Sequence, residues 1–522
     1  MSKMNRRSSP KIMGKDTAAE SIGMGISGRS WATQTGGAQA PKPEDLKNPN
    51  WEDWEFYYPG KYDAEDTKIL SALKAKLDQI NNKGAINIDD LISGKLEGKP
   101  GISKKEITSE SLKTIIDNYG ANNPIWSDKE YAKKTKWGAM AIPFGVAGPM
   151  GLPAMTKNEG IADYMVVTAH NDTVSYYKPV YEGETLYSVI DEQHFNDITP
   201  SQGSYYRTFT MRGWGRVFNK KGELVAEGAV MLNESFRRHK DPAERNPSKA
   251  HAWESPDWWT TRPIYQYTDE DWEEIKTIWK NENIRGIEVL YWDDVKVGDQ
   301  PTPRAVGPIL PEEQTDMLMS VPKWSVDTKL NMLDQKIFAT MKKNKQGIYV
   351  LPQYLEKKPA SRPFTGASTD APIVQTPEIT SRDGRCVIMN AIPAYWAGGM
   401  IINWMGNSGW LQRIGWDITE IPPGTSKAID FTKDPTIIPT IPMKLRSALF
   451  DKYPYMGKVP FMKTKRADCH ALEGDLVICN GYVTSKYSKG GEYFVDLTWW
   501  CETFDKYIIE EGFATVKLPK KA

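Results

Sequence analysis

Apolar and polar positions follow two periods along this chain, one typical of a helix and one typical of strands. Residues 63–83, "DAEDTKILSALKAKLDQINNK", place Ile and Leu side chains at helical spacing, which predicts a support helix that packs on the elements after it. Residues 204–232 and 474–518 instead form short β-rich runs broken by glycine-bearing turns at 220–222 and 489–491. These two stretches predict antiparallel meanders.

The same order of short motifs occurs twice, which predicts an internal repeat. The three pairs of motifs are "IDDLISG" (88–94) with "WDDVKVG" (292–298), "YKPVYEGETL" (177–186) with "DCHALEGDLV" (468–477), and "AEGAVML" (226–232) with "EEGFATV" (510–516). Paired acids and Glu-Gly turns are common on protein surfaces, so one pair alone would carry little weight. Three pairs in the same order predict two halves, each a helical segment followed by an antiparallel meander.

The repeat divides the chain into four predicted parts. They are a flexible N-terminal arm (1–45), a first repeat with the support helix (46–240), a linker with a short helix (241–285) and a second repeat (286–518) with an insertion at about 320–385. The arm is rich in Ser, Gly, Lys and Thr without periodicity. In the linker, Thr268 and Asp271 form a weak capping pair at the start of the short helix.

Composition and charge restrict the classes of partner. The chain has 522 residues, enough for more than one core. Its 67 basic and 67 acidic residues give a formal net charge of zero, which favours neither nucleic acid nor an anionic membrane. We therefore expect a small molecule or another protein as the partner. The 19 Trp and 24 Tyr residues suit flat apolar clefts, and equally subunit interfaces or core packing.

Cysteine and histidine usage bears on metals and on the cellular compartment. The four cysteines include no CxxC pair, and with five histidines no zinc or iron–sulfur spacing is recognisable. Neither a metal site nor a disulfide framework is predicted, which favours a reduced cytoplasm. The basic N-terminal stretch lacks the apolar block of a signal peptide, and no segment approaches about 18 uncharged apolar residues. We expect a cytoplasmic protein that is neither exported by that route nor membrane-spanning.

Residues 107–146, "ITSESLKTIIDNYGANNPIWSDKEYAKKTKWGAMAIPFGV", resemble the N-terminal repeat of MaoC-like double hot-dog hydratases and dehydratases, together with "YYKPVYEGETL" and "NKKGELVAEGAVML". The second half is similar to the other repeat of that family through "YWDDVKVGDQPTPRAVGPI", "INWMGNSGWLQRIGW" and its closing strands. The resemblance covers about 100–240 and 286–518. It implies an α+β fold in which each repeat wraps a curved antiparallel sheet around one long helix, and the two sheets join into a continuous double hot dog.

The resemblance also implies an activity. In that family an acyl-CoA thioester lies in a tunnel between the repeats, and water is added to, or removed from, the α,β double bond. This chemistry needs a base, and backbone N–H groups at a helix start that hold the developing enolate oxygen. Coenzyme A arrives as part of the substrate, so no separate cofactor is expected. The expected assembly is a homo-oligomer or a heteromer with a homologous hot-dog subunit.

Catalytic repeats of the family carry Asp and His around an Asn-Pro turn, in the order Gly-Asp-x-Asn-Pro-x-His. This chain has Ala121 in place of the acid and Trp126 in place of the imidazole, so the stretch resembles the substrate-binding half of diverged members. We expect Asn123 and Trp126 to contact the substrate, with Tyr395 and Asn407 contributing from the second half. The second half has no such motif either, so the usual dyad is absent from the chain.

Two acid–imidazole pairs elsewhere are candidates for a substitute dyad. His170 and Asp172 are two residues apart, so on a strand both side chains leave the same face; the alternative is a hydrogen-bonded pair at a strand edge that faces solvent. Asp468 and His470 have the same spacing before a surface turn, where a structural role is the alternative. For Asn407, the alternative to substrate binding is a buried amide with satisfied hydrogen bonds.

The sequence thus predicts a lyase, a hydratase or dehydratase that acts on an α,β-unsaturated or 3-hydroxy acyl-CoA with an atypical acid–base set. His170 and Asp172 are its predicted catalytic residues, and Asp468 and His470 are secondary candidates. One alternative is a non-catalytic subunit that binds the thioester or stabilises the partner in a heteromeric hydratase. A third possibility is an acyl-CoA thioesterase.

Overall fold

The computed structural model describes residues 64–109, 123–139, 165–197, 207–236, 264–309, 328–352, 355, 391–417, 471–506 and 508–522. The predicted N-terminal arm, Asp468 and His470 lie outside these residues. The elements of the first part are α2 (Ala64–Asn81), α3 (Ile88–Ile92), β1 (Ile102–Glu106), α5 (Pro124–Ser127), α6 (Lys129–Lys133), β2 (Met165–Tyr176), β3 (Thr185–Asp197), β4 (Arg207–Asn219) and β5 (Leu224–Phe236). Those of the second part are α9 (Asp269–Asn281), the 3₁₀ helix η5 (Trp292–Asp294), β6 (Arg304–Val306), α11 (Thr328–Leu333), α12 (Gln335–Phe338), β7 (Lys342–Lys343), β8 (Tyr349–Val350), α13 (Ala391–Met405), β9 (Trp410–Asp417), β10 (Val477–Lys489), β11 (Glu492–Thr503) and β12 (Ile508–Lys517).

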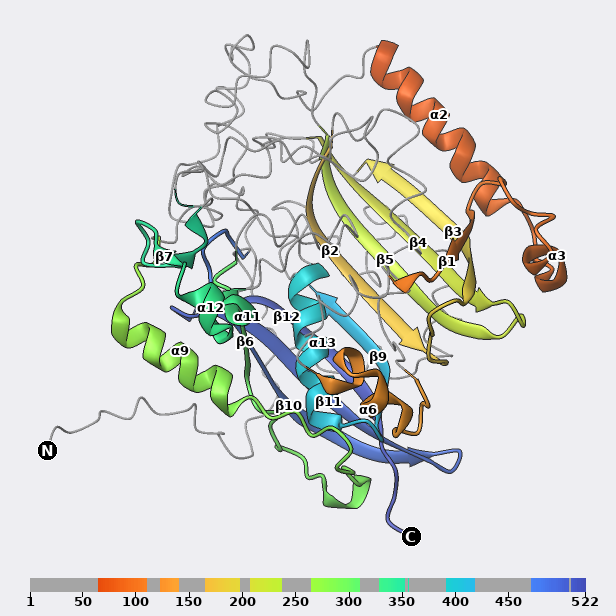
Figure 1. Cartoon of the computed structure of the whole chain (residues 1–522). Helices are drawn as coiled ribbons and strands as arrows, with labels where there is room; N and C mark the ends of the chain where they lie inside the picture. Colours follow the sequence, from red (N-terminus) through yellow and green to blue (C-terminus); the bar gives the residue numbers. More distant parts are fainter. Residues whose placement is uncertain are drawn as a thin grey trace, which may run out of the picture.

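Ten strands form one antiparallel sheet whose strand order is mirrored about its middle (Figure 1). The order is β1-β3-β4-β5-β2-β9-β12-β11-β10-β6. Strands β1 to β5, here called the N-terminal half, lie on one side, and β6 with β9 to β12, the C-terminal half, lie on the other. The halves meet where β2 pairs with β9, from Asp172 opposite Trp416 to Ser175 opposite Arg413. We call this pair of strands the seam.

Corresponding turns in the two halves make the same backbone hydrogen bonds. The N–H of Gly183 donates to the carbonyl of Ile107, and the N–H of Gly474 donates to the carbonyl of Ile309, both at 2.8 Å. Both glycines have positive φ, 84° and 87°, which costs other residue types energy. They are the glycines of the second motif pair, so this turn repeats as the sequence predicts.

The acid that follows each of these glycines also has the same partner in both halves. The carboxylate of Glu184 accepts a hydrogen bond from the N–H of Tyr181 (2.9 Å), and that of Asp475 accepts one from the N–H of Leu472 (2.7 Å). Each side chain closes its turn over three residues, as acidic turn residues commonly do. Glu-Gly-Glu and Glu-Gly-Asp are therefore matching structural units.

The two hairpin turns predicted from the sequence are confirmed. Strand β4 ends at Asn219 and β5 begins at Leu224, with Gly222 at a φ of 74° between them. Strand β10 ends at Lys489 and β11 begins at Glu492. The sheet and the helices around it agree with the predicted α+β class. A long helix in each half stays a prediction, because the segment before β2 lies outside the described residues.

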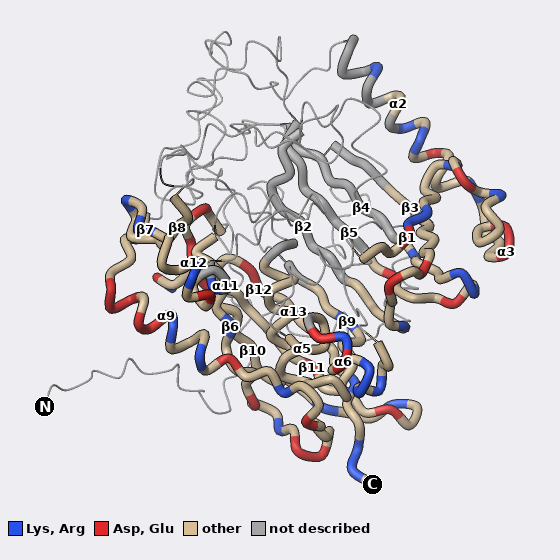
Figure 2. Tube along the Cα trace, viewed as in Figure 1, with Lys and Arg blue, Asp and Glu red and all other residues tan. Residues whose placement is uncertain are grey.

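Helix α13 lies across the C-terminal half and supplies one side of the main core (Figure 1). Its sequence has no charged residue, whereas charged residues gather on the outer helices and hairpin turns (Figure 2). Alternate residues of β11, Leu497, Trp499 and Cys501, are buried in one cluster with α13, so this face of the sheet is the helix-covered face. Gly512 makes room for Trp499 there, since a Cβ at Gly512 would lie 2.4 Å from the indole.

The predicted support helix is α2, and it packs on β3. Leu77 and Ile80 are buried. Asn81 at its end donates a side-chain hydrogen bond to the carbonyl of Gln193 and accepts one from the N–H of the same residue, both at 2.8 Å. The amide therefore fixes the helix end to the edge of the N-terminal half.

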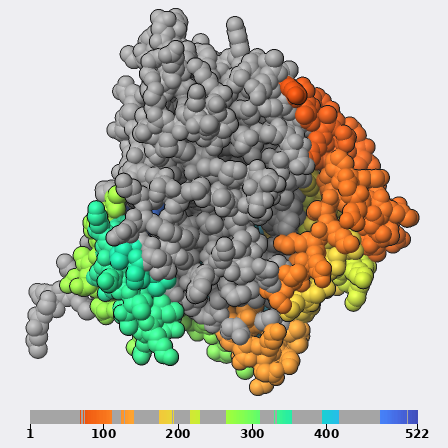
Figure 3. Space-filling view, turned by 45° about the horizontal axis from the view of Figure 1, so that its top comes forward, coloured from red at the N-terminus to blue at the C-terminus, as the bar shows by residue number. Residues whose placement is uncertain are grey.

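The predicted short helix is α9, which begins with a capping box between Thr268 and Asp271. Its buried residues Trp272, Ile275 and Trp279 pack with residues of β6 and β10, so α9 covers the outer edge of the C-terminal half. Residues 64–109 and 328–350 lie on opposite sides of the face in Figure 3. The boundaries of the four predicted parts stay predictions.

Candidate functional site

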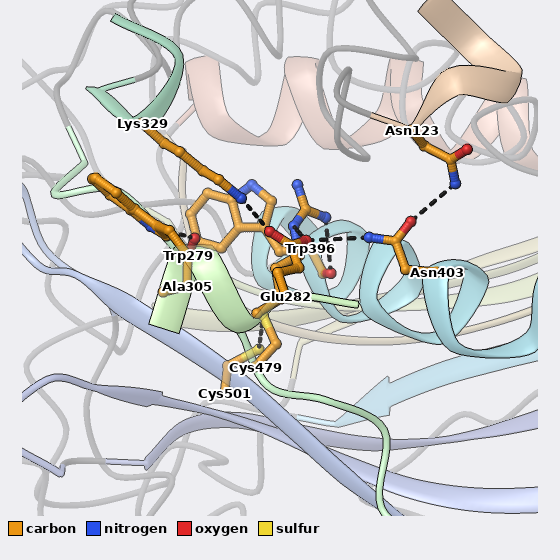
Figure 4. A network of polar contacts seen from close by, with 10 residues as sticks. Asn123, Trp279, Glu282, Ala305, Lys329, Trp396, Asn403, Cys479 and Cys501 are labelled. Carbon is orange, nitrogen blue, oxygen red and sulfur yellow. Dashed lines mark hydrogen bonds and ion pairs between the residues drawn. The ribbon is translucent and has the colours of Figure 1, made fainter. Parts of the chain in front are cut away.

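The Asn-Pro turn holds a side chain that links the two halves. Asn123 is the N-cap of α5: its Oδ1 accepts a hydrogen bond from the N–H of Ile125 (3.1 Å), and Pro124 occupies the first turn, where no N–H is needed. The Nδ2 of Asn123 donates to Oδ1 of Asn403 in α13 (2.9 Å), 280 residues away in sequence (Figure 4). With 1% of its surface exposed, Asn123 is a buried link and not a surface cap.

Asn403 continues this link to a buried carboxylate. Its Nδ2 donates to Oε1 of Glu282 (3.1 Å), which follows α9 directly. Glu282 also forms ion pairs with Lys329 and, at 3.6 Å, with Nε of Arg304. We call Asn123, Glu282, Arg304, Lys329 and Asn403 the polar network (Figure 4). Buried charges are costly unless paired and hydrogen-bonded, and here both cations share one carboxylate.

Arg304 also attaches α13 to the sheet. Its Nη1 donates to the backbone carbonyl of Trp396 (3.2 Å) in α13. Because Arg304 belongs to β6, the guanidinium ties the outer strand of the C-terminal half to its central helix. Arg285 makes a second tie, with Nε donating to the carbonyl of Trp404 (2.7 Å), which suits a cation at a helix C-terminus.

Asn407 lies in the turn just after α13, where a residue of α6 and one shortly after α6 contact it. Its Nδ2 donates to the hydroxyl of Tyr131 (3.0 Å), and its carbonyl accepts from Nε1 of Trp137 (3.0 Å). The indole of Trp137 also packs on Trp410, with ring centroids 5.3 Å apart. The amide is buried and hydrogen-bonded, which is the structural alternative that the sequence left open for Asn407.

Trp126 and Tyr395 both belong to the main core. Trp126 is buried within the same cluster as the α13 side chains. Tyr395 is half-buried and packs against that cluster. The structure thus brings Asn123, Trp126, Tyr395 and Asn407 to the surroundings of one helix, although they come from both halves. Their predicted contacts with substrate stay predictions.

His170 and Asp172 lie in β2, which has a strand on each side over the stretch that begins at Asp172. Asp172 pairs with Val230 of β5 on one side and with Trp416 of β9 on the other. The strand is therefore interior at Asp172, and the choice between the two interpretations of His170 and Asp172 stays open. Continuing across the sheet, Trp416 pairs with Gly512 and Gly512 with Trp499. Position 172 thus belongs to a cross-strand row of the helix-covered face.

Tyr177, which follows β2, is tied to a carboxylate. Its hydroxyl donates to Oε1 of Glu227. Burial raises the pKa of Tyr177 well above its usual value, and the negative charge of Glu227 raises it further. The phenol therefore stays protonated at any physiological pH. Glu227 is opposite Ser175 of β2. The neighbouring residue Val174 belongs to the helix-covered face, and successive residues of a strand alternate between faces. Ser175 and Glu227 therefore lie on the other face of the sheet.

Sequence reasoning missed the charged members of the polar network. Glu282 follows the buried residues Trp272, Ile275 and Trp279 of α9 at helical spacing, and this signal could have placed it on the buried side. No comparable signal marks Arg304, which sits in a strand of three residues, or Lys329. Their partners come from distant parts of the chain.

Two further findings concern metal ions and membrane spans in the described residues. No group of three or more His, Cys, Asp and Glu side chains there is arranged to hold a metal ion. In the same part of the chain, no helix is both long and apolar enough to cross a membrane.

No protein-family model matches this chain, and no curated protein matches it. The chain resembles MaoC-like hot-dog proteins of known structure. A MaoC domain dehydratase from Chloroflexus aurantiacus has 11% identity and a TM-score of 0.37, with 80% of this chain and 94% of that chain covered. A double hot-dog protein from Mycobacterium tuberculosis has 8% identity and a TM-score of 0.39, with 84% and 99% covered.

A shorter match is the ChsH1–ChsH2 complex from Mycobacterium tuberculosis. The identity is 16% and the TM-score 0.23, with 33% of this chain and 96% of that chain covered. That neighbour is a complex of two different subunits. All three TM-scores are below 0.5, so these likenesses do not assign a function to this chain.

Proposed function

We propose that this chain is a hydratase or dehydratase of an α,β-unsaturated or 3-hydroxy acyl-CoA, with a double hot-dog fold and its site beside the seam. The observation that carries the proposal is the link from Asn123 to Asn403. Through it, the Asn-Pro turn of one half is fixed to the central helix of the other half, which is where the resemblance expects a thioester to lie.

The position of the candidate dyad supports the same proposal. Asp172 is at an interior position of the seam, on a row of the helix-covered face, and His170 is two residues before it in the same strand. Acid–base groups for hydration must act on a substrate that is shielded from bulk water. The mirrored strand order and the repeated Gly183 and Gly474 turns support the two-repeat fold.

The first test is hydration by the purified full chain. We expect loss of the enoyl double bond with a panel of enoyl-CoA esters, and a fall of about two to four orders of magnitude in the His170→Ala, Asp172→Ala double variant. His194→Ala is the matched control, because His194 is also a strand histidine but lies in β3, away from the seam. Full turnover by the double variant would retire the proposed dyad.

A non-catalytic role is favoured by a different observation. The side-chain amides of Asn123 and Asn407 already form hydrogen bonds with other residues of this chain. Such use of the amides is expected of a subunit that stabilises an assembly. In that case the chain alone would be inactive, and activity would appear only after a homologous hot-dog subunit is added. Release of free coenzyme A without hydration would instead identify a thioesterase.

A further inference from the structure

Lys136, in the segment after α6, has unusual surroundings for a lysine. Its Nζ donates to the carbonyl of Ser408 (2.7 Å) and lies 4.3 Å from the centre of the Trp137 ring. Among the described residues, no carboxylate pairs with Lys136, whereas Lys133, three residues earlier, pairs with Glu130 at 2.6 Å. The amine of Lys136 therefore lacks the nearby negative charge that favours the protonated form.

A second lysine lies beside this amine. Lys517, the last residue of β12, is the cross-strand partner of Trp410, and Trp410 packs on Trp137, with ring centroids 5.3 Å apart. These contacts bring Lys517 close enough to Lys136 for the two positive charges to interact. Lys517 also pairs with Glu492 of β11 at 2.8 Å, which balances part of its charge.

These surroundings favour the neutral form of the amine. Partial burial of the amine, together with the positive charge of Lys517, lowers the pKa of Lys136 to about 8. At pH 7, roughly one Lys136 amine in ten is then neutral, against about one in three thousand for an ordinary lysine. Lys136 is nevertheless an exposed residue, so a dissolved reagent can reach it.

A neutral lysine beside another cation is suited to nucleophilic chemistry. Desolvation and a neighbouring positive charge are the two ways in which proteins activate a lysine amine, and Lys136 has both. An acyl thioester is a matching reagent, because its carbonyl carbon is electrophilic and its sulfur leaves readily. Acyl-CoA, the substrate class of the proposed function, is a thioester of this kind.

We propose that Lys136 is an acylation site of this chain, at which the amine beside Lys517 takes the acyl group of an acyl thioester. The neutral amine attacks the carbonyl carbon, and a C–N bond forms as the C–S bond breaks. The sulfur leaves as a thiolate and takes up the proton that the nitrogen releases, so the products are an amide and a free thiol. Acylation removes one of two neighbouring cations at the end of α13. The step needs no hydration activity and goes beyond the proposed function.

The test incubates the folded full chain with acetyl-CoA and follows the acetylation of each lysine by mass spectrometry. Acetyl-CoA has no double bond to hydrate, so the result is independent of the proposed function. Lys133 is the matched control, because it is exposed and in the same segment but paired with Glu130. At about pH 7.5, we expect Lys136 to react at least about tenfold faster than Lys133. This ratio is smaller than the gain in neutral amine, because nucleophilicity falls as the pKa falls.

The pH dependence and one variant test the cause of the reactivity. The neutral amine is the nucleophile, so acetylation of Lys136 should rise up to about pH 8 and then level off. In the urea-unfolded chain it should continue to rise toward about pH 10, as for an ordinary lysine. Lys517→Gln removes the neighbouring positive charge and frees Glu492, so it should slow the reaction of Lys136 and move the plateau to higher pH.

Three results would overturn the inference. They are equal rates at Lys136 and Lys133, the same pH profile in the folded and unfolded chain, and an unchanged rate at Lys136 in Lys517→Gln. None of them bears on whether the chain hydrates an enoyl ester.

Discussion

At the scale of single residues, the two halves are joined by side chains that satisfy one another. Asn123 caps α5 with its oxygen and binds Asn403 with its nitrogen, so both ends of one amide are used. Glu282 accepts from Asn403 and balances two cations. A complete buried network of this kind adds little stability compared with apolar residues of the same volume. The loss of one member, however, leaves a buried charge without a partner, which costs stability.

Glu282→Gln should therefore destabilise the chain strongly. The change leaves Lys329 and Arg304 beside a neutral amide, and breaking a buried ion pair costs about 3–5 kcal/mol. Urea unfolding followed by tryptophan fluorescence measures the loss. Glu273→Gln is the control, because Glu273 forms an exposed pair with Lys276 and should cost under about 1 kcal/mol. Equal effects of the two changes would show that Glu282 is not held as the structure describes.

Trp126→Ala tests whether Trp126, which stands where the family motif has a histidine, is a core residue. Trp126 is buried in the main cluster, and truncation of a core Trp costs about 3–5 kcal/mol. We expect this loss in the free energy of unfolding, and a much smaller one in Trp126→Phe. A stable Trp126→Ala variant with altered acyl-chain selectivity would instead place the ring in the wall of a substrate tunnel.

At the scale of elements, the end of α13 is the point on which several segments converge. Gly406 follows the helix with a φ of 69°, and its N–H donates to the carbonyl of Ile402 (3.1 Å), as in a left-handed helix cap. A Cβ at Gly406 would lie 2.9 Å from the carbonyl oxygen of Glu288. The segment after α9 thus passes too close to the helix end for any side chain.

Gly406→Ala should consequently loosen the attachment of α13. A non-glycine residue in this backbone conformation costs about 1–3 kcal/mol, and the contact with Glu288 adds to it. Gly490→Ala is the matched change, because Gly490 also has positive φ but has open space around it. We expect the thermal midpoint to fall further for Gly406→Ala. The reverse order would show that the close approach to Glu288 is absent.

The elements that could be predicted from the sequence are those fixed by local chemistry. The turns at Gly183 and Gly474 repeat because a glycine and a following acid determine a turn within a few residues. The role of Glu282 could not be predicted in the same way, because its partners Arg304, Lys329 and Asn403 come from β6, α11 and α13. Burial of polar groups depends on such distant contacts, which no short sequence pattern records.

The candidate site also combines local features that the sequence predicts with long-range features that it does not. Asn123 belongs to the Asn-Pro turn that the sequence motif marks, and its role as the N-cap of α5 is a local feature. The sequence pattern left the position of His170 and Asp172 in the sheet open, because an interior strand and an edge strand can have the same alternation. The position of Lys136 near Lys517 depends on contacts between residues far apart in the chain.

At the scale of the whole molecule, one sheet and one network make the two halves a single unit. The seam joins β2 to β9 through backbone pairing, and the polar network joins the Asn-Pro turn to α13 on the helix-covered face. A site built from both halves would therefore have fixed geometry, as acid–base catalysis requires. This arrangement is the basis for proposing that one chain carries the reaction.

The most direct test is hydration of enoyl-CoA esters by the purified full chain alone in oxygen-18 water, with the products analysed by mass spectrometry. The account predicts one labelled oxygen at the β-carbon of the 3-hydroxyacyl product, and loss of that product in the His170→Ala, Asp172→Ala variant. An unlabelled, unchanged pool of every ester in the presence of the folded chain would contradict it.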